Sequence, residues 1–358
     1  MSEPATTDRP RPAPRAQTEA EAAFETSGHT GTPVSWWRGP DQLTYEAALV
    51  ADLLVGEIDH VINFAPTRHL YGHLFGEVLP ATRGVDVHHA WRHAVTEVPP
   101  LRPGARTLLV CLPSTWPLLR RLLTPLGALP RAVALHSTAA APEAAKEVVH
   151  ALRGTGFTAH ALLGSTETGA VAHRPIAPAG TDDGPWRLLP DVVLVPDLRA
   201  ARTADPVQPL HVISPRLGRR HDMAEPPASW RTTDLVRRRG LREFDHLGRS
   251  SRLVKANGVR VWLDEVESAV AEALPGLDVA CLPVPDGVRG EHYEMYCAPR
   301  PHGDTAPEGP RTVHGVLARR LPGVPGPRAV HLVDRIPRSP LGKVRIPELR
   351  VPVSGKTA

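Results

Sequence analysis

Two short segments rich in glycine and hydroxyl side chains are the first candidates for chemistry in this sequence. The first runs from Thr26 to Pro33 and reads TSGHTGTP, and the second runs from Gly164 to Gly169 and reads GSTETG. Glycine lets backbone amides turn toward an anion, so the first segment is typical of a phosphate loop, with an ordinary polar loop as the alternative. It lacks the Gly-Lys-Ser/Thr ending of the Walker type, which disfavours a kinase or a GTPase.

The second segment carries a carboxylate, Glu167, and directly follows a stretch that predicts a buried strand. Mg²⁺ at phosphate sites takes one or two carboxylates and keeps several waters. A carboxylate beside hydroxyl groups at the end of a strand suits that ion. The alternative is a polar turn that only ends the strand.

Charged residues mark two further regions, the stretch from Trp230 through Arg260 and the segment SPLGKVR from Ser339 to Arg345. In the first, Asp234 can accept hydrogen bonds from both hydroxyls of a ribose, and Arg249 can donate to a sugar or a phosphate. Taken singly, Asp234 is more often a turn residue and Arg249 a surface charge.

Lysine is scarce, which gives weight to a lysine inside a motif. Only four of the 42 basic residues are lysines, namely Lys146, Lys255, Lys343 and Lys356. The compact ammonium of lysine and the planar guanidinium of arginine are not interchangeable. Lys343 therefore stands out from a solvated tail lysine.

Length and composition set the class of protein. A chain of 358 residues with 41% hydrophobic content can form a full core and fits two domains better than one. The net charge of +4 is spread along the chain, which gives no support to a nucleic-acid partner. No stretch approaches the length of a membrane helix. The three cysteines show no metal or disulfide spacing, so a cytoplasmic location is the default.

The pattern of apolar residues predicts where these motifs lie. Helical patterns near residues 43–55, 116–126 and 142–153 alternate with buried strands, which predicts an α/β fold with a mainly parallel sheet. Ligands of such sheets bind at the carboxyl ends of the strands. The chain becomes strand-rich after about residue 185. Beyond about residue 250 it predicts a small α+β unit with a helix over 264–274, whose Asp264 and Glu267 fit a capping box.

The four motifs, in this order, resemble those of the adenylate-forming superfamily, which includes acyl- and aryl-CoA synthetases, luciferases and the adenylation domains of peptide synthetases. The resemblance runs from about Thr26 to Arg345. It implies a large N-terminal α/β domain joined by a hinge to a small C-terminal α+β domain. We therefore expect a disordered arm over residues 1–20, an adenylation core over 21–249 and a mobile domain over 250–358.

The resemblance also implies roles for individual residues. Thr166 would contact the α-phosphate, Glu167 would bind Mg²⁺, Asp234 would hold the ribose, and Arg249 would contact ribose and phosphate. Lys343 would reach from the C-terminal domain to bridge the α-phosphate and the substrate carboxylate. The remaining expected site residues are Thr26, Ser27, Gly28, Thr30, Gly31, Gly164 and Ser165 for the nucleotide, Ser251 for the hinge, and Lys255 and Gly258 for the thiol channel.

Several positions depart from the family pattern. Val34 stands where the phosphate loop normally ends in lysine, which makes Arg38 a candidate charge partner for the phosphates. His29 replaces a small hydroxyl residue, and Leu163 replaces the aromatic residue that stacks on adenine. The acyl pocket would include His69, Ser137 and Thr138. The hinge position holds Ser251 instead of the usual Asp or Lys, and the large region that normally precedes the phosphate loop is absent.

The expected activity is ATP- and Mg²⁺-dependent conversion of an aryl or acyl carboxylic acid to acyl-AMP, followed by acyl transfer to coenzyme A or a carrier-protein phosphopantetheine. The altered loop and the absent N-terminal region leave two alternatives: an enzyme completed by a partner subunit, and a non-catalytic descendant that serves as a binding or scaffold subunit. No nucleic-acid or membrane partner is expected. The oligomeric state stays open, with a homodimer as one option.

Overall fold

The computed structural model describes most of the chain. The described residues are 21–26, 34–94, 97–137, 141–197, 206–256, 259–286, 290–300, 309–338, 344–345 and 349. The predicted arm over residues 1–20 lies outside them.

A large mixed sheet forms the centre of the fold. Within the described residues it has eleven strands in the order β10-β11-β13-β14-β9-β8-β7-β6-β5-β3-β4. One half is parallel, as the alternation of helices and strands predicts. Its strands are β4 (Asp86–His88), β3 (His60–Asn63), β5 (Arg106–Cys111), β6 (Arg131–His136) and β7 (Phe157–Ser165).

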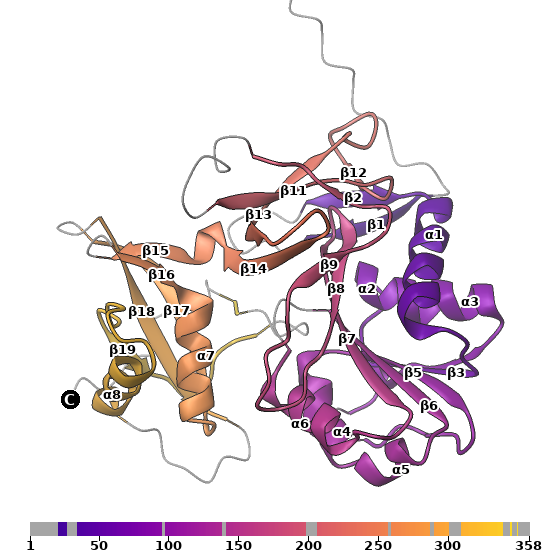
Figure 1. Cartoon of the computed structure of the whole chain (residues 1–358), viewed down its shortest axis with the longest axis horizontal. Coiled ribbons are helices and arrows are strands. Elements are labelled where there is room, and N and C mark those ends of the chain that lie inside the picture. Colours follow the sequence, from indigo (N-terminus) through magenta and orange to yellow (C-terminus); the bar gives the residue numbers. More distant parts are fainter. Residues whose placement is uncertain are drawn as a thin grey trace, which may run out of the picture.

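Helices connect the parallel strands and cover them. The chain leaves β3 for β4 in one direction, and it leaves β5 for β6 and β7 in the other. Because such crossovers are right-handed, the two directions place their helices on opposite faces of the sheet. Figure 1 shows α1–α3 gathered on one side of these strands and α4–α6 on the other. The helices are α1 (Pro40–Val50), α2 (Leu70–His73), α3 (Leu79–Arg83), α4 (Trp116–Arg120), α5 (Leu123–Gly127) and α6 (Glu143–Ala151).

The helix expected near 116–126 is two short helices instead of one. The break falls between α4 and α5, just before Pro125. Proline has no N–H and is tolerated only in the first turn of a helix, so α5 restarts at Leu123.

The other half of the sheet is antiparallel, so the sheet is mixed instead of mainly parallel throughout. This half corresponds to the strand-rich region expected after about residue 185. The short β7–β8 and β13–β14 connections carry no helix and therefore permit only antiparallel pairing. Its strands are β8 (Gly169–Pro175), β9 (Trp186–Leu188), β14 (Glu243–Arg249), β13 (Trp230–Arg238), β11 (Val207–Ile213) and β10 (Val193–Leu194).

A separate three-stranded sheet brings the start of the described chain beside a much later segment. In it, β2 (Ser35–Arg38) pairs with both β1 (Ala22–Glu25) and β12 (Arg219–Arg220). The Trp36 ring of β2 meets the Trp230 ring at the start of β13, with centroids 4.8 Å apart and planes at 79°. That edge-to-face contact links the small sheet to the large one.

The last part of the chain forms its own α+β unit. A two-stranded ribbon of β15 (Leu253–Ala256) and β16 (Val259–Trp262) leads into α7, and a three-stranded sheet and α8 follow. Its buried residues form clusters apart from the cluster that fills the first part of the chain. Its other elements are α7 (Leu263–Ala273), β17 (Leu277–Asp286), β18 (Gly290–Pro299), α8 (Pro310–Arg320) and β19 (Val330–Leu332). The division into domains at residue 250 stays a prediction.

The capping box expected for α7 is wrong. No side chain caps this helix. Instead, the Glu267 carboxylate accepts hydrogen bonds from the Arg252 guanidinium and the Cys281 amide, while Arg252 Nε donates to Asp264 at 2.8 Å. The partly buried Arg252 guanidinium offers these carboxylates a stronger, charge-assisted bond than the helix N-terminus does.

Across the described residues, no helix is long and apolar enough to pass through a lipid bilayer.

A histidine pair on β7 and β8 makes stability depend on pH. Burial lowers the pKa of His160 to about 4, and the neighbouring His173 and Arg131 add to that effect. The unfolded state, with an ordinary pKa of about 6.5, then binds more protons between pH 6.5 and 4. The stability that neutral His160 provides is therefore complete above pH 6.5 and is lost as the pH falls toward 4.

We expect the free energy of unfolding to fall by about 2 kcal/mol from this group between pH 7 and pH 4.5. Urea unfolding at both pH values, in the wild type and in His160→Gln, measures it. The glutamine variant should lose about that much of the pH dependence. His150→Gln, at an exposed position at the end of α6, should leave the dependence unchanged. Equal behaviour of the two variants would contradict the assignment.

Candidate active site

The Gly164–Gly169 motif forms the turn between β7 and β8, at the carboxyl end of the last parallel strand. Within it, the Ser165 and Thr168 hydroxyls lie 3.1 Å apart, and Thr168 Oγ1 donates to the Gly169 carbonyl at 2.8 Å. Gly164 pairs with Ala170 across the hairpin. The turn is therefore a rigid polar tip at the sheet edge where ligands bind.

Glu167 projects from this turn with its main chain held and its side chain free. Its carbonyl accepts from the Gly218 amide at 2.8 Å. Its carboxylate is half-exposed, and no hydrogen bond or ion pair engages it within the described part of the chain. A free carboxylate beside the Thr166 hydroxyl fits the oxygen donors that Mg²⁺ takes.

Arg38, expected to be a charge partner of the phosphates, is enclosed by protein instead of open to a ligand. It is fully buried, and its guanidinium donates to the carbonyl of Arg216 and, at 3.0 Å, to that of Thr166. Its Nη1 lies 3.8 Å from Glu46 Oε2. The guanidinium thus lies beneath the Gly164–Gly169 turn, because buried carbonyls and a buried carboxylate need a cation as a partner.

Sequence reasoning missed Glu46, which touches the same turn from α1. It is 1% exposed, and its Oε1 accepts from the Ala170 amide at 2.7 Å. A signal was present: the buried stripe of α1 is Leu43, Glu46, Ala47 and Val50, so a carboxylate stands among apolar residues. A charged residue at such a position needs a partner, which is a reason to examine it.

Gly169 makes room for that carboxylate. Its φ is +68°, and a Cβ there would lie 2.3 Å from Glu46 Oε2. A side chain is therefore excluded by both the backbone conformation and the space.

We expect Gly169→Ala to lower the free energy of unfolding by about 2–4 kcal/mol, because a left-handed backbone and overpacking act together. Gly180→Ala is a matched control, since Gly180 also has a positive φ (+80°) but has open space around the added Cβ. It should cost only about 1–2 kcal/mol. Urea unfolding of both variants measures the difference. Equal losses of unfolding free energy would show that the Glu46 side chain moves away from the added Cβ without cost.

A second group of predicted residues meets on the β13–β14 hairpin. Asp234 lies directly across from Arg249, and Arg249 Nε is 3.4 Å from Asp234 Oδ1. The Asp234 amide also donates to Thr232 Oγ1 at 3.1 Å. The hairpin therefore brings together two residues that are 15 positions apart in the chain.

His246 was missed by the sequence reasoning and completes this group. Its Nε2 lies 2.9 Å from Asp234 Oδ1. Burial alone would raise the pKa of Asp234, but the His246 hydrogen bond and the Arg249 charge outweigh it, and the pKa is lowered. The carboxylate is ionised and can only accept, so His246 is the donor, and Oδ2 has no partner among the described residues.

The phosphate-loop segment is closed at its base by Thr26 and Val34. The Thr26 amide donates to the Val34 carbonyl at 3.0 Å, and the Val34 amide donates to Thr26 Oγ1 at 3.2 Å. Thr26 therefore anchors the β1–β2 hairpin from which the loop arises. The residues between them lie outside the described part of the chain.

The other predicted residues are spread over several elements. His69 precedes α2, and Ser137 follows β6; both are half-buried. Lys255 is exposed on β15, and Ser251 is exposed in a 3-10 turn over Ser250–Arg252. The predicted residues outside the described part of the chain are Ser27, Gly28, Thr30, Gly31, Thr138, Gly258 and Lys343.

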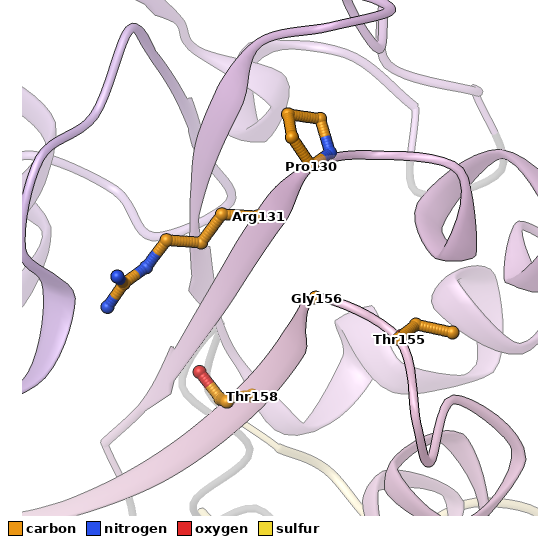
Figure 2. A pocket seen from close by; sticks show the side chains of 5 residues that line it. All are labelled: Pro130, Arg131, Thr155, Gly156 and Thr158. Atoms are coloured by element: carbon orange, nitrogen blue, oxygen red, sulfur yellow. The ribbon is translucent and has the colours of Figure 1, made fainter.

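A surface hollow of about 350 Å³ lies at the opposite edge of the sheet, at the amino ends of β6 and β7. Figure 2 shows its lining, in which Arg131 is the sole charged side chain and Thr155 and Thr158 supply hydroxyl groups. It shares no residue with the candidate site. In the described ranges, no three His, Cys, Asp or Glu side chains gather as a metal site.

Two curated proteins with similar sequences are both named 4-coumarate–CoA ligase. The one from Halorhodospira halophila is 26% identical over 329 residues, which are 90% of this chain and 74% of that protein. The one from Rhodobacter capsulatus is 29% identical over 274 residues, which are 74% of this chain and 60% of that protein. No family model matches the chain.

Solved structures match over nearly all of the chain. ATP-bound MatB from Rhodopseudomonas palustris has a TM-score of 0.69 at 22% identity, over 92% of this chain and 67% of that one. The anthranilate CoA ligase AuaEII in complex with anthranoyl-AMP has a TM-score of 0.72 at 18% identity, over 92% and 66%. At these identities the likeness is one of fold.

Proposed function

We propose that this chain, which belongs to the adenylate-forming superfamily of AMP-dependent ligases, activates a carboxylic acid with ATP and passes the acyl group to a thiol. The observation that carries the proposal is the buried, ionised Asp234 held between His246 and Arg249. One carboxylate oxygen there is left to accept a ribose hydroxyl.

The two groups of residues divide the nucleotide between them. Asp234 and Arg249 would hold the ribose and the adjoining phosphate, and Thr166 would donate to the α-phosphate. The loop from Thr26, with Ser27, Gly28, Thr30 and Gly31, would hold the β- and γ-phosphates. Gly164 and Ser165 shape the turn that carries Thr166.

Mg²⁺ would be held by Glu167 and would offset the negative charge of the phosphates. The support is the half-exposed carboxylate, which has no other partner among the described residues. A hard cation with several retained waters needs no more than one such ligand from the protein.

In the adenylation step, a carboxylate oxygen of the acid forms a bond to the α-phosphorus, and the bond from that phosphorus to the pyrophosphate oxygen breaks. Both reactants are anions, so their repulsion opposes the reaction. Lys343, between the α-phosphate and the carboxylate, would offset that repulsion and hold the two in line, which is positional and electrostatic catalysis.

The acyl acceptor would be coenzyme A or the phosphopantetheine of a carrier protein, reached past Lys255 and Gly258. After adenylation, thiol sulfur attacks the acyl carbon and AMP leaves. The names of the two sequence relatives support coenzyme A. Partial matches to synthases of peptide natural products, such as the isonitrile lipopeptide synthase of Mycobacterium tuberculosis, support a carrier protein. The acid would contact His69, Ser137 and Thr138.

Pyrophosphate release and acyl hydroxamate formation test the proposal. The purified, folded protein is given ATP and Mg²⁺ with a panel of aryl and acyl carboxylic acids. At least one acid should give both products. If every acid fails and calorimetry detects no ATP binding, the chain is a non-catalytic descendant of the fold.

A further inference from the structure

We infer that a buried cluster of Arg38, Glu46 and Arg216 positions the Thr166–Glu167 turn for nucleotide and metal binding, a role that rests on the proposed function. These side chains are positioning residues, because they act through the turn and contact no substrate atom. They come from three parts of the chain, β2, α1 and the segment between β11 and β12.

The cluster is a charge network removed from water. Arg38 and Arg216 have no exposed side-chain surface, and Glu46 has 1%. Glu46 Oε2 lies 3.8 Å from Arg38 Nη1 and 3.4 Å from Arg216 Nη1. Asp191 receives two hydrogen bonds from Arg216, at 2.7 and 3.0 Å. Two cations thus face two anions, and no net charge is buried.

Burying such a network gives little stability over a well-packed apolar cluster. Among the described residues, Arg38 Nε has no hydrogen-bond partner, and Glu46 Oε2 meets Arg216 Nη1 at 3.4 Å without a well-aligned hydrogen bond; poorly met hydrogen bonds of buried polar atoms carry a cost. The presence of these charges is therefore better explained by the backbone groups that they bind than by the stability that they add.

The charged cluster holds the main chain on both sides of Glu167. Arg38 Nη2 donates to the Thr166 carbonyl at 3.0 Å, and Glu46 Oε1 accepts from the Ala170 amide at 2.7 Å. The Gly218 amide, two residues after Arg216, donates to the Glu167 carbonyl at 2.8 Å. The turn is fixed at three points, while the Glu167 carboxylate stays free for a ligand.

Helix α1 contributes twice to this arrangement. Gln42 lies one turn before Glu46 on the same face, and its Nε2 is 3.2 Å from the carbonyls of both Pro215 and Leu217. The helix therefore ties the Arg216 segment to the turn. Preorganised partners of this kind determine how well a metal ligand and a phosphate donor are aimed.

Arg38 also places a cation beside the Thr166–Glu167 turn in a chain whose phosphate-loop motif lacks its expected lysine. Val34 occupies that lysine position, and the Arg38 guanidinium donates to the carbonyl of Thr166, the residue just before Glu167. The cation thus acts on the site from below the turn, through Glu167 and Thr166, and not by contact with the β- and γ-phosphates.

Arg38→Met tests the role, with Arg38→Lys as the conservative variant and Arg38→Met/Glu46→Gln as the charge-balanced one. Three quantities are measured for each variant: MgATP affinity by calorimetry, the hydrogen exchange rates of the 165–170 amides, and the KM values for ATP and for the acid. We expect Arg38→Met to weaken MgATP binding by about 10- to 100-fold and to speed exchange in the turn. KM for the acid should change by less than about twofold, and Arg38→Lys should restore part of the MgATP affinity.

The matched control is Arg174→Met. Arg174 also pairs with a carboxylate, Asp183 at 3.1 Å, and donates to a carbonyl, that of Gly184 at 3.2 Å, in the same sheet but away from the turn. This variant should lose stability yet bind MgATP as the wild type does. If Arg38→Met does not fold, the charge-balanced double variant carries the same expectation, because the Arg216–Asp191 pair remains intact.

Two outcomes are decisive and differ. If the wild type binds MgATP and a folded Arg38 variant binds it equally well with unchanged exchange, the positioning role is wrong and the proposed function stands. If the wild type itself binds no MgATP, the proposed function fails and the positioning role with it.

Discussion

Lys343→Ala is expected to lower the rate of acyl-AMP formation by about 10²- to 10³-fold, the loss seen when one preorganised electrostatic donor is removed from a reacting centre. The reason is that two anions must meet, and the other lysine in a motif, Lys255, is assigned to the thiol channel and not to the α-phosphate. Pyrophosphate release with a saturating acid measures the loss. Nucleotide binding should weaken far less, since Asp234 and Arg249 remain.

Lys343→Arg should stay strongly impaired, because a planar guanidinium does not reproduce the position of a compact ammonium between two oxygens. Lys146→Ala is the matched control. Lys146 is a lysine outside every motif, 3.7 Å from Asp183, and its loss should change the rate by less than about twofold.

The two half-reactions give a further check on Lys343. Supplied acyl-AMP should react with a thiol in the Lys343→Ala variant at close to the wild-type rate, because the lysine acts only in the first step. Unchanged pyrophosphate release in this variant would show that the charge at the α-phosphate comes from elsewhere.

The motifs whose geometry could be predicted from sequence are those in which all residues lie on one hairpin. The Gly164–Gly169 turn and the Asp234–Arg249 pair each depend on one hairpin, so their spacing along the chain already indicates their geometry. The α/β class follows for the same reason, since apolar periodicity is local. The mixed character of the sheet does not, because strand direction depends on which strands pair.

The contacts that sequence could not supply join distant segments. Glu46 reaches the Ala170 amide across 124 positions, and Arg38 reaches the Thr166 carbonyl across 128. Arg38 was assigned to the phosphates because of its position near the loop, but burial decides its partners. Its guanidinium lies where carbonyls converge, and only the packed structure shows that.

His246 illustrates a local case that was still missed. It lies three residues before Arg249 on the same strand and donates to the same carboxylate oxygen, Asp234 Oδ1. The bulged register between Leu235 and Val236 brings His246 toward Asp234, and a sequence pattern does not reveal a bulge.

The second large expected effect is a loss of ribose recognition when Asp234 on that hairpin is replaced. We expect the wild type to prefer ATP over 2′-deoxy-ATP by about 10- to 150-fold in kcat/KM, because a hydrogen bond to a charged group contributes about 1.5–3 kcal/mol. In Asp234→Ala this preference should fall below about threefold. The kcat/KM for ATP should drop by about 10²- to 10³-fold, because Oδ2, whose two lone pairs can accept from both ribose hydroxyls, is lost.

Asp245→Ala is the matched control for that experiment. Asp245 lies next to His246 on the same strand, and it pairs with Arg239 at 2.8 Å on the surface. Its loss should leave both kcat/KM and the preference for ATP unchanged, since surface ion pairs contribute little. If Asp234→Ala keeps the wild-type preference for ATP, the ribose is held elsewhere, and the Asp234–His246–Arg249 group serves only to close the hairpin.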